Sequence, residues 1–238
     1  MNLAVHTTRT MLHGAVETDI AGHAAICDPS GALYLEADRI LIVSDLHFEK
    51  GSSFARRGMM LPPYDTASTL KALAASIARY QPACVISLGD SFHDGDAAAR
   101  LPAIYAEQLA TLMHGRDWIW ITGNHDPEHP ADLPGETYTE LAFGALVFRH
   151  EPSKTASRGE IAGHLHPAAK VVRRGQSVQR RCFVTDHTRM IMPAFGAYTG
   201  GLNILGRAFH GLFDSNSLKA YMLGHARVYP MLRKTLYP

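Results

Sequence analysis

Cysteine, long apolar runs and net charge are all scarce in this sequence of 238 residues. The three cysteines lie far apart and form no CxxC pair, which argues against a disulfide framework and fits a reducing compartment. No stretch approaches the roughly 20 apolar residues of a membrane span, and the first residues lack the apolar segment of a signal peptide. We therefore expect a cytoplasmic protein without membrane contact, and the net charge of +1 identifies no anionic partner.

The composition is that of an ordinary globular protein. Hydrophobic residues make up 46% and charged residues 19% of the chain, which excludes intrinsic disorder and a fibrous class. A chain of this length buries a sizeable core without disulfides. Because no repeat, low-complexity segment or linker is visible, we expect a single domain over residues 1–238.

The basic residues are unevenly distributed along the chain. Residues 149–181 contain eight basic residues and two acidic ones, although the whole chain is nearly neutral. A local basic patch could steer a phosphate-bearing substrate toward the protein. The alternative is a solvated surface loop without a ligand, and the sequence leaves both open.

The first half of the chain alternates strand-like and helix-like patterns. Extended structure is expected over residues 24–45, with a turn at DPSG, and strands are expected in ACVISLGD and WIWITGNHD. Helices are expected over residues 65–80, with Asp65 as the N-cap, and over residues 97–114. This order favours an α/β sheet covered by helices. After residue 140 the short candidate strands LVFRH, EIAGH, KVVRR, RCFVT and RMIMPA predict a second, more antiparallel sheet packed on the first.

Polar residues follow the three predicted strands of the first half. Asp45 and His47 end the first strand, Asp90 ends the second, and Asn124 ends the third. In open α/β sheets, ligands bind beyond the carboxyl ends of the strands, so these side chains are expected to converge. Asp45 and His47 are two residues apart, which would point both to one side of an extended chain.

Three histidines in the second half complete a candidate metal site. His150 ends LVFRH, and His164 and His166 repeat the alternate spacing in GHLH. The expected metal ligands are Asp45, His47, Asp90, Asn124, His150, His164 and His166. This nitrogen and oxygen set without thiolates suits Mn, Fe or Zn better than Mg or Ca alone. A lone DxH or HxH is more often structural, but the ordered set favours metal binding.

The order D-x-H, GD, GNHD, H and GHxH over residues 45–166 resembles the calcineurin-like metallophosphoesterase superfamily. The segments SDLHFEKGSSFARRG, GDSFHD, AGHLHPA and PAFGAYTGG are similar to the bacterial DNA ligase-associated metallophosphoesterases, and they extend the resemblance to about residue 201. Members of that family are encoded beside an ATP-dependent DNA ligase, a helicase and a nuclease. The resemblance therefore implies a functional link to those proteins and a role in DNA repair.

The resemblance also implies a fold and a ligand assignment. The fold is a four-layer αββα sandwich of two mixed β-sheets flanked by helices, with two divalent ions, most often Mn²⁺, at one edge. One ion would be held by Asp45, His47, Asp90 and His166, and the other by Asp90, Asn124, His150 and His164. His125 would be the catalytic imidazole, with Asp126 orienting it.

The resemblance implies phosphodiester hydrolysis by an endonuclease that acts on single-stranded DNA. Two cations neutralise the phosphoryl charge, and a bridging hydroxide attacks phosphorus in line with the leaving oxygen. His125 would assist the leaving alkoxide as an acid, which typically contributes about 10²–10⁴ in rate.

Substrate contacts are expected from residues close to the metal motifs. Lys50, Arg56 and Arg57 follow the first motif and are expected to bind DNA phosphates; the alternative is a helix surface with local salt bridges. His93 is a candidate phosphate contact, and its alternative role is a structural hydrogen bond.

The sequence leaves two other functions open. The first is a phosphodiesterase or phosphomonoesterase acting on nucleotides or other small phosphate esters, which the metal motifs cannot distinguish from a nuclease. The second is a non-catalytic interaction scaffold. A scaffold is expected to have eroded ligands or a replaced His125, whereas every expected ligand is present here.

Overall fold

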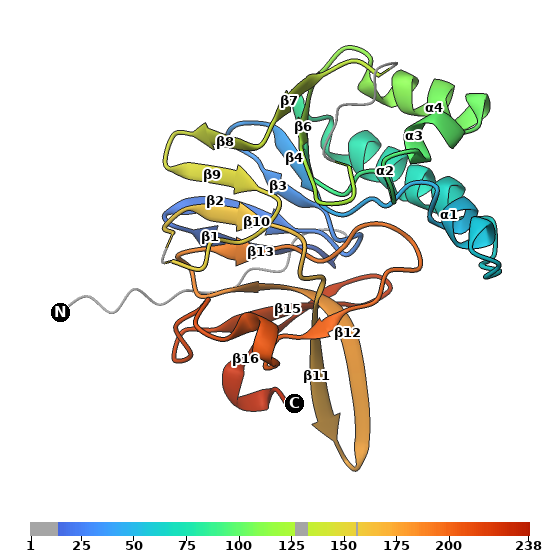
Figure 1. Cartoon of the computed structure of the whole chain (residues 1–238). Coiled ribbons are helices and arrows are strands. Elements are labelled where there is room, and N and C mark those ends of the chain that lie inside the picture. The colour runs from blue at the N-terminus through green and yellow to red at the C-terminus, as the bar shows by residue number, and fades with distance from the viewer. Residues whose placement is uncertain (1–13, 127–132, 156) are drawn as a thin grey trace.

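The computed structural model describes residues 14–126, 133–155 and 157–238, and these form two stacked mixed β-sheets with α-helices gathered on one side (Figure 1). This confirms the expected pair of mixed sheets. Among the described residues, no helix is both long and apolar enough to cross a bilayer.

The first sheet has seven strands that lie in chain order. Its strands are β1 (Val16–Ile20), β2 (His23–Cys27), β3 (Leu33–Leu35), β4 (Ile40–Val43), β5 (Cys84–Leu88), β6 (Asp117–Ile121) and β7 (Glu136–Tyr138). Strands β1 to β4 pair antiparallel, and β4 to β7 pair parallel. Parallel neighbours need long crossovers. These crossovers contain the helices α1 (Lys50–Arg56), α2 (Asp65–Tyr80), α3 (Ala97–Arg100) and α4 (Ala103–Met113).

The second sheet contains the strands predicted after residue 140. Along its main path the order is β14, β11, β12, β13, β10, β9, β8, while β15 pairs with β12 and β16 pairs with β15. The bounds are β8 (Glu140–Phe143), β9 (Leu146–Arg149), β10 (Glu160–Ala162), β11 (Pro167–Arg173), β12 (Gln176–Thr185), β13 (Met190–Ile191), β14 (Leu202–Asn203), β15 (Lys219–Leu223) and β16 (Val228–Leu232). Strands β9, β10 and β13 run parallel, and most other pairs are antiparallel.

Three buried clusters separate four layers. One cluster packs Leu73 and Leu109 of the helices on the first sheet, and a second fills the space between the sheets. The third covers the outer face of the second sheet with Ile204, Phe209 and Leu236. This fourth layer contains the 3-10 turns η2 (Arg207–Phe209) and η3 (Arg233–Thr235) instead of an α-helix. Four glycines between residues 200 and 211 disfavour an α-helix there.

Two helix predictions need correction. Asp65 is the first residue of α2 and not its cap, because its Oδ2 accepts a hydrogen bond from the Gly51 N–H of α1 at 2.9 Å. The helix expected over residues 97–114 is broken at Leu101, whose ψ of 120° is extended. Proline disfavours the helical conformation in the residue before it, and Pro102 follows Leu101.

Candidate metal centre

The carboxyl ends of strands from both sheets meet at one edge of the molecule. Strands β4, β5 and β6 of the first sheet end before Asp45, Asp90 and Asn124, and β9 and β10 of the second end before His150 and His164. The register of the parallel pairs aligns these ends. The ligands predicted from strand ends in the sequence therefore do converge.

One ligand group consists of Asp45, His47 and His166. Their potential ligand atoms lie within 4.8 Å of one another. His47 Nε2 is 3.4 Å from His166 Nε2, and His166 Nε2 is 3.2 Å from Asp45 Oδ1. Burial is the main cause that lowers the pKa of His47 to about 3, so this imidazole is neutral and can bind a metal near neutral pH.

The second group consists of Asp90, His150 and His164, with Asn124 beside it. Asn124 Oδ1 is 3.0 Å from both His150 Nε2 and His164 Nδ1, and those two nitrogens are 3.2 Å apart. His150 Nε2 also lies 3.4 Å from Asp90 Oδ2. The four residues thus present oxygen and nitrogen atoms to one small volume.

The donor set fits a cation at each group. His150 Nδ1 donates to the Leu88 carbonyl at 2.8 Å, so a neutral His150 presents the lone pair of Nε2 to the Asn124 oxygen. Two facing lone pairs repel unless a positive charge lies between them. In the other group, the fully buried Asp45 Oδ1 forms no hydrogen bond that meets the geometric limits within the described residues, although His166 Nε2 lies 3.2 Å away. A buried carboxylate oxygen without a hydrogen bond is costly, and a metal ion relieves that cost.

The nearby carboxylates attract positive charge to this position, which a bound cation or a proton on His150 can supply. Burial alone would lower the pKa of His150, but the hydrogen bond to Asp90 and the charges of Asp90 and Asp45 raise it to about 9. The bond from His150 Nδ1 to a backbone carbonyl resembles the support that fixes the ring of many metal-binding histidines.

The backbone at the ligands is not extended as expected. Positive φ angles occur at Asp45 (52°), His47 (47°), Asp90 (48°), His164 (66°) and His166 (44°). The interpretation that an extended chain brings Asp45 and His47 to one side is therefore wrong; left-handed turns do so instead. Left-handed residues other than glycine cost about 1–2 kcal/mol each and persist where surrounding contacts fix them. Such strain concentrates at functional sites.

Glycines before the ligands allow the close approach of neighbouring segments. Gly89 has a φ of 75°, and a Cβ atom on it would lie 2.5 Å from His150 Nδ1. A Cβ on Gly163 would overlap the Ser44 hydroxyl. Backbone bonds join the first two motifs as well, since the His47 N–H donates to the Asp90 carbonyl at 2.9 Å.

Residues 193–202 form a strap across the first ligand group. The Phe195 and Gly196 N–H groups donate to the Ser44 and Asp45 carbonyls, and the Leu202 N–H donates to the His166 carbonyl. Arg181 Nη1 in turn donates to the Ala194 carbonyl at 2.6 Å and lies within 3.4 Å of the next two carbonyls. The sequence marked PAFGAYTGG as a subfamily motif and counted Arg181 in the basic segment 149–181, but it predicted no contact between the two.

His125 lies beside the ligand groups and is not among them. Its Nε2 is 3.9 Å from Asp90 Oδ2, and its side chain is 44% exposed. Its ring stacks on the His93 ring with centroids 5.5 Å apart. The His125 N–H donates to Asp90 Oδ1 at 2.9 Å, which fixes the residue against the metal centre.

The Asp126 carboxylate bonds the backbone of neighbouring segments, and the role that the resemblance implied, orienting His125, stays a prediction. Its Oδ2 accepts hydrogen bonds from the Ser91 and Phe92 N–H groups, and its Oδ1 accepts one from the Gly123 N–H. These bonds tie the third motif to the second. Burial, followed by the charge of nearby Asp90, raises the pKa of Asp126 to about 7.

The four expected substrate contacts divide into two kinds. Lys50 and His93 are partly buried near the centre, and His93 Nδ1 lies 3.4 Å from His47 Nδ1, which matches the alternative structural role. Burial lowers the pKa of His93 to about 4, with smaller effects from neighbouring cations. Arg56 and Arg57 are exposed at the end of α1, and Arg56 forms a surface ion pair with Asp96 at 3.2 Å.

The basic segment 149–181 is not one continuous patch. Arg149 forms ion pairs with Glu140 and Glu160, Arg158 donates to the Ala21 carbonyl, and Arg181 holds the strap. Among the described residues, the other basic residues of this segment lie on the loop after β9 and on the β11–β12 hairpin.

Comparison with known proteins matches this geometry. Residues 38–177 match the model of the calcineurin-like phosphoesterases. The chain belongs to the calcineurin-like phosphoesterase family. It is therefore a metal-dependent phosphoesterase, and the two ligand groups indicate two divalent ions.

Among solved structures, the Pseudomonas putida nuclease MPE is similar to this phosphoesterase. The two are 28% identical, with a TM-score of 0.71, over 91% of this chain and 100% of that one. The match to AQ665 from Aquifex aeolicus, a protein of unknown function, covers 53% of this chain and 78% of the AQ665 chain, at 16% identity and a TM-score of 0.38. The E. coli phosphoesterase Yfce covers 81% and 97% at 16% identity and a TM-score of 0.40. Comparison with curated protein sequences gives no match.

Proposed function

We propose that this phosphoesterase is an endonuclease that cuts single-stranded DNA in a repair setting with two divalent ions. The observation that carries the proposal is the pair of adjacent ligand groups with an exposed imidazole, His125, beside them. The similarity to a nuclease over 91% of the chain supports DNA as the substrate. A functional link to an ATP-dependent DNA ligase, a helicase and a second nuclease belongs to the same proposal.

Each ion has its own set of proposed ligands. Asp45, His47, Asp90 and His166 would hold one ion, and Asp90, Asn124, His150 and His164 would hold the other. The mixed nitrogen and oxygen donors suit Mn²⁺, with Fe and Zn as alternatives. When bound, the two ions supply charge neutralisation at the phosphoryl group and activation of water near neutral pH.

His125 would serve the leaving group. Stacking on His93 and the backbone bond to Asp90 hold its ring at the edge of the centre, while the exposed part stays open to substrate. A protonated Nε2 can donate to the leaving oxygen. Asp126 would contribute by clamping the loop that carries His125, since its carboxylate bonds the backbone of the neighbouring motif.

Circular single-stranded DNA tests this proposal, because only an endonuclease can cut a strand without ends. We expect the protein with Mn²⁺ to convert circles to linear fragments, and Asp90→Asn to be inactive. A cyclic nucleotide and an aryl phosphodiester are assayed in parallel. Hydrolysis of these small esters with intact circles would favour the small-substrate function, and no hydrolysis of any substrate by the metal-loaded protein would favour a scaffold.

A further inference from the structure

The β11–β12 hairpin extends away from the second sheet into solvent (Figure 1). The residues of β12 from Gln176 to Arg181 pair only with β11 among the described strands, whereas Cys182 to Thr185 pair with β13 and β15 in the body of the sheet. All residues from 172 to 180 are exposed. An isolated two-stranded ribbon adds little stability by itself, so its length calls for another explanation.

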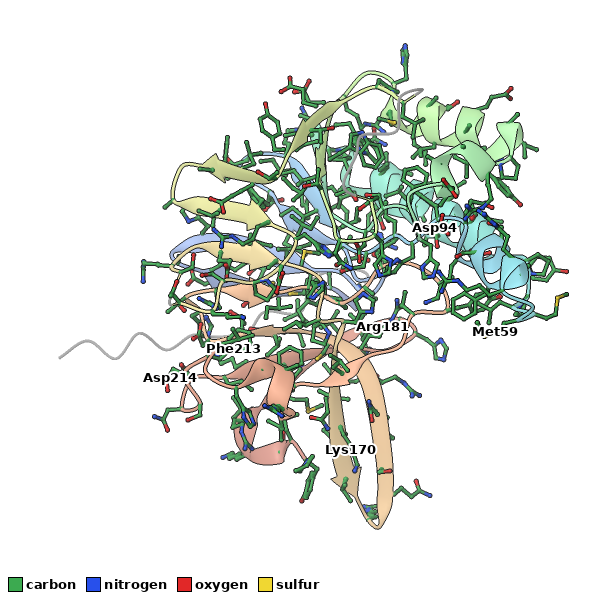
Figure 2. The ribbon with its side chains drawn as sticks, viewed as in Figure 1. Met59, Asp94, Lys170, Arg181, Phe213 and Asp214 are labelled. Atoms are coloured by element: carbon green, nitrogen blue, oxygen red, sulfur yellow. The ribbon has the colours of Figure 1, made fainter. Side chains whose placement is uncertain are left out.

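The charge of the hairpin has one sign. Residues 161–185 contain five basic residues and no acidic one. Arg173 and Arg174 lie at the outer end and form no ion pair with the described residues, and Arg180 is also exposed. Lys170 and Arg181 lie nearer the base of the hairpin (Figure 2). Lys170 Nζ donates to the Pro238 carbonyl.

The hairpin begins at the metal centre. Strand β11 starts at Pro167, directly after the proposed ligand His166, and the register pairs Ala168 with Arg181. The six paired residues of each strand extend about 20 Å from this point, at about 3.3 Å per residue. A basic ribbon of that length is thus fixed to one side of the site.

A polyanion with regularly spaced charges fits this ribbon best. Pairing with the same hairpin of a second copy of the chain would bring positive charges against positive charges. A lipid surface would need large apolar residues at the tip, whereas the exposed apolar residues of the hairpin are Val172 and Val178. Two-stranded ribbons are an established means of contacting nucleic acids, and arginine pairs well with phosphate.

We infer that the β11–β12 hairpin is an arm that binds the phosphates of the DNA strand on one side of the cleaved bond. This inference rests on the proposed nuclease function and deepens it. The arm raises affinity for long strands and takes no part in the hydrolysis itself.

The test removes two charges from the tip. The variant Arg173→Gln/Arg174→Asn keeps the turn, because Arg174 has a φ of 52° and asparagine tolerates that conformation. The matched control is Arg39→Asn/Lys71→Gln. Both residues are exposed; Lys71 lies on α2, Arg39 precedes β4 at the end of the first sheet away from the metal ligands, and its φ of 54° also suits asparagine.

We expect both variants to hydrolyse an aryl phosphodiester at the wild-type rate. For a thirty-nucleotide single strand, only the tip variant should raise KM. Each phosphate contact contributes about 0.7 to the slope of log affinity against log salt for single strands, so losing two contacts lowers the slope by about 1.4. Between 50 and 200 mM salt the wild type should then lose about sevenfold more affinity than the tip variant.

The outcomes separate the two ideas. If the wild type cuts DNA and the tip variant keeps the wild-type KM and salt slope, the inference about the arm is wrong and the nuclease proposal stands. If the wild type hydrolyses only the aryl ester, the nuclease proposal fails first. A KM increase that persists with a dinucleotide, which is too short to reach the tip, would also overturn the arm. The inference would also be wrong if the tip variant lost binding to polyglutamate or to anionic vesicles as much as it lost binding to DNA.

Discussion

Asp90 occupies the position where the two ligand groups meet. Its Oδ2 lies 3.4 Å from His150 Nε2, its Oδ1 accepts the His125 N–H, and its carbonyl accepts the His47 N–H. Hydrogen bonds and charge from His150 lower the pKa of Asp90 to about 2 despite the opposing effect of burial. The residue therefore stays ionised and touches both groups and the candidate acid.

Mutation of Asp90 and mutation of Asp45 should therefore have different effects on the number of bound ions. We expect Asp90→Asn to lose both ions and Asp45→Asn to lose one, because only Asp90 is proposed to contact both. Asparagine tolerates the positive φ at both positions, so the backbone should be preserved. Metal analysis of the purified variants checks the stoichiometry. Retention of one ion by Asp90→Asn would show that Asp90 does not bridge.

His125 is expected to act on the leaving group and not on the metals. His125→Ala should keep two ions per chain and lose about 10²–10⁴ in kcat on esters with an alkyl leaving group. Esters of a nitrophenol need little acid assistance and should be cleaved with a much smaller loss. Loss of metal from this variant would make His125 a structural ligand and would contradict the role.

The strands could be predicted from the sequence more reliably than the turns and loops that connect them. Apolar runs predicted the strands that precede Asp45 and Asp90, since the spacing of buried side chains is local information. The left-handed turns at the ligands were missed, because aspartate and histidine rarely adopt positive φ without contacts from distant segments. The strap over residues 193–202 was missed for a similar reason: its bonds to Asp45 and His166 join segments far apart in the chain.

The strap depends on Arg181 for its position. Arg181 holds three successive carbonyls, and burial lowers the pKa of its guanidinium. Arg181→Met should free the strap and weaken metal binding at the Asp45 group by roughly tenfold, since supporting contacts around metal ligands typically contribute about 10–100-fold. Titration with Mn²⁺ measures this affinity. Arg180→Met is the control, because Arg180 is exposed and, within the described part of the chain, donates a hydrogen bond only to the Gln179 carbonyl. Equal losses in both variants would exclude the strap role.

Asp94 connects the second metal loop to α3 (Figure 2). Both its oxygens accept hydrogen bonds from Arg100, at 2.9 and 2.8 Å, and these bonds hold the pKa of Asp94 well below its usual value. The folded-state pKa is depressed, so the contribution is full above the unfolded pKa of about 3.9 and is lost progressively as pH falls from there through the folded pKa. Asp94→Asn should cost about 1.5–3 kcal/mol at pH 7 and less at pH 3.

Urea unfolding in EDTA at the two pH values measures this difference without interference from bound metal. Asp96→Asn is the matched control, because Asp96 pairs with Arg56 in an exposed ion pair that contributes little. A pH-independent cost for Asp94→Asn would show that packing, and not ionisation, is responsible.

At the scale of the whole molecule, the metal centre joins the two sheets. Asp45, His47 and Asp90 follow strands of the first sheet, and His150 and His164 follow strands of the second. The order of motifs in the sequence predicted this ligand set, but nothing local in it specified which strands of the second sheet align with the first. That alignment comes from the core between the sheets, where residues such as Ile42 and Phe148 are fully buried.

Because ligands from both sheets would share the two ions, metal release should loosen the whole sandwich. A ligand at 100 times its Kd stabilises the folded state by about 2.7 kcal/mol, and a protein of this size gains about 2–4 °C in Tm per kcal/mol. EDTA should therefore lower the Tm of the Mn²⁺-loaded protein by about 5–10 °C, measured by calorimetry. Asp90→Asn, which should not hold the ions, is expected to show little shift. An unchanged Tm in the wild type would mean that the folded state does not bind the ions more tightly than the unfolded chain does.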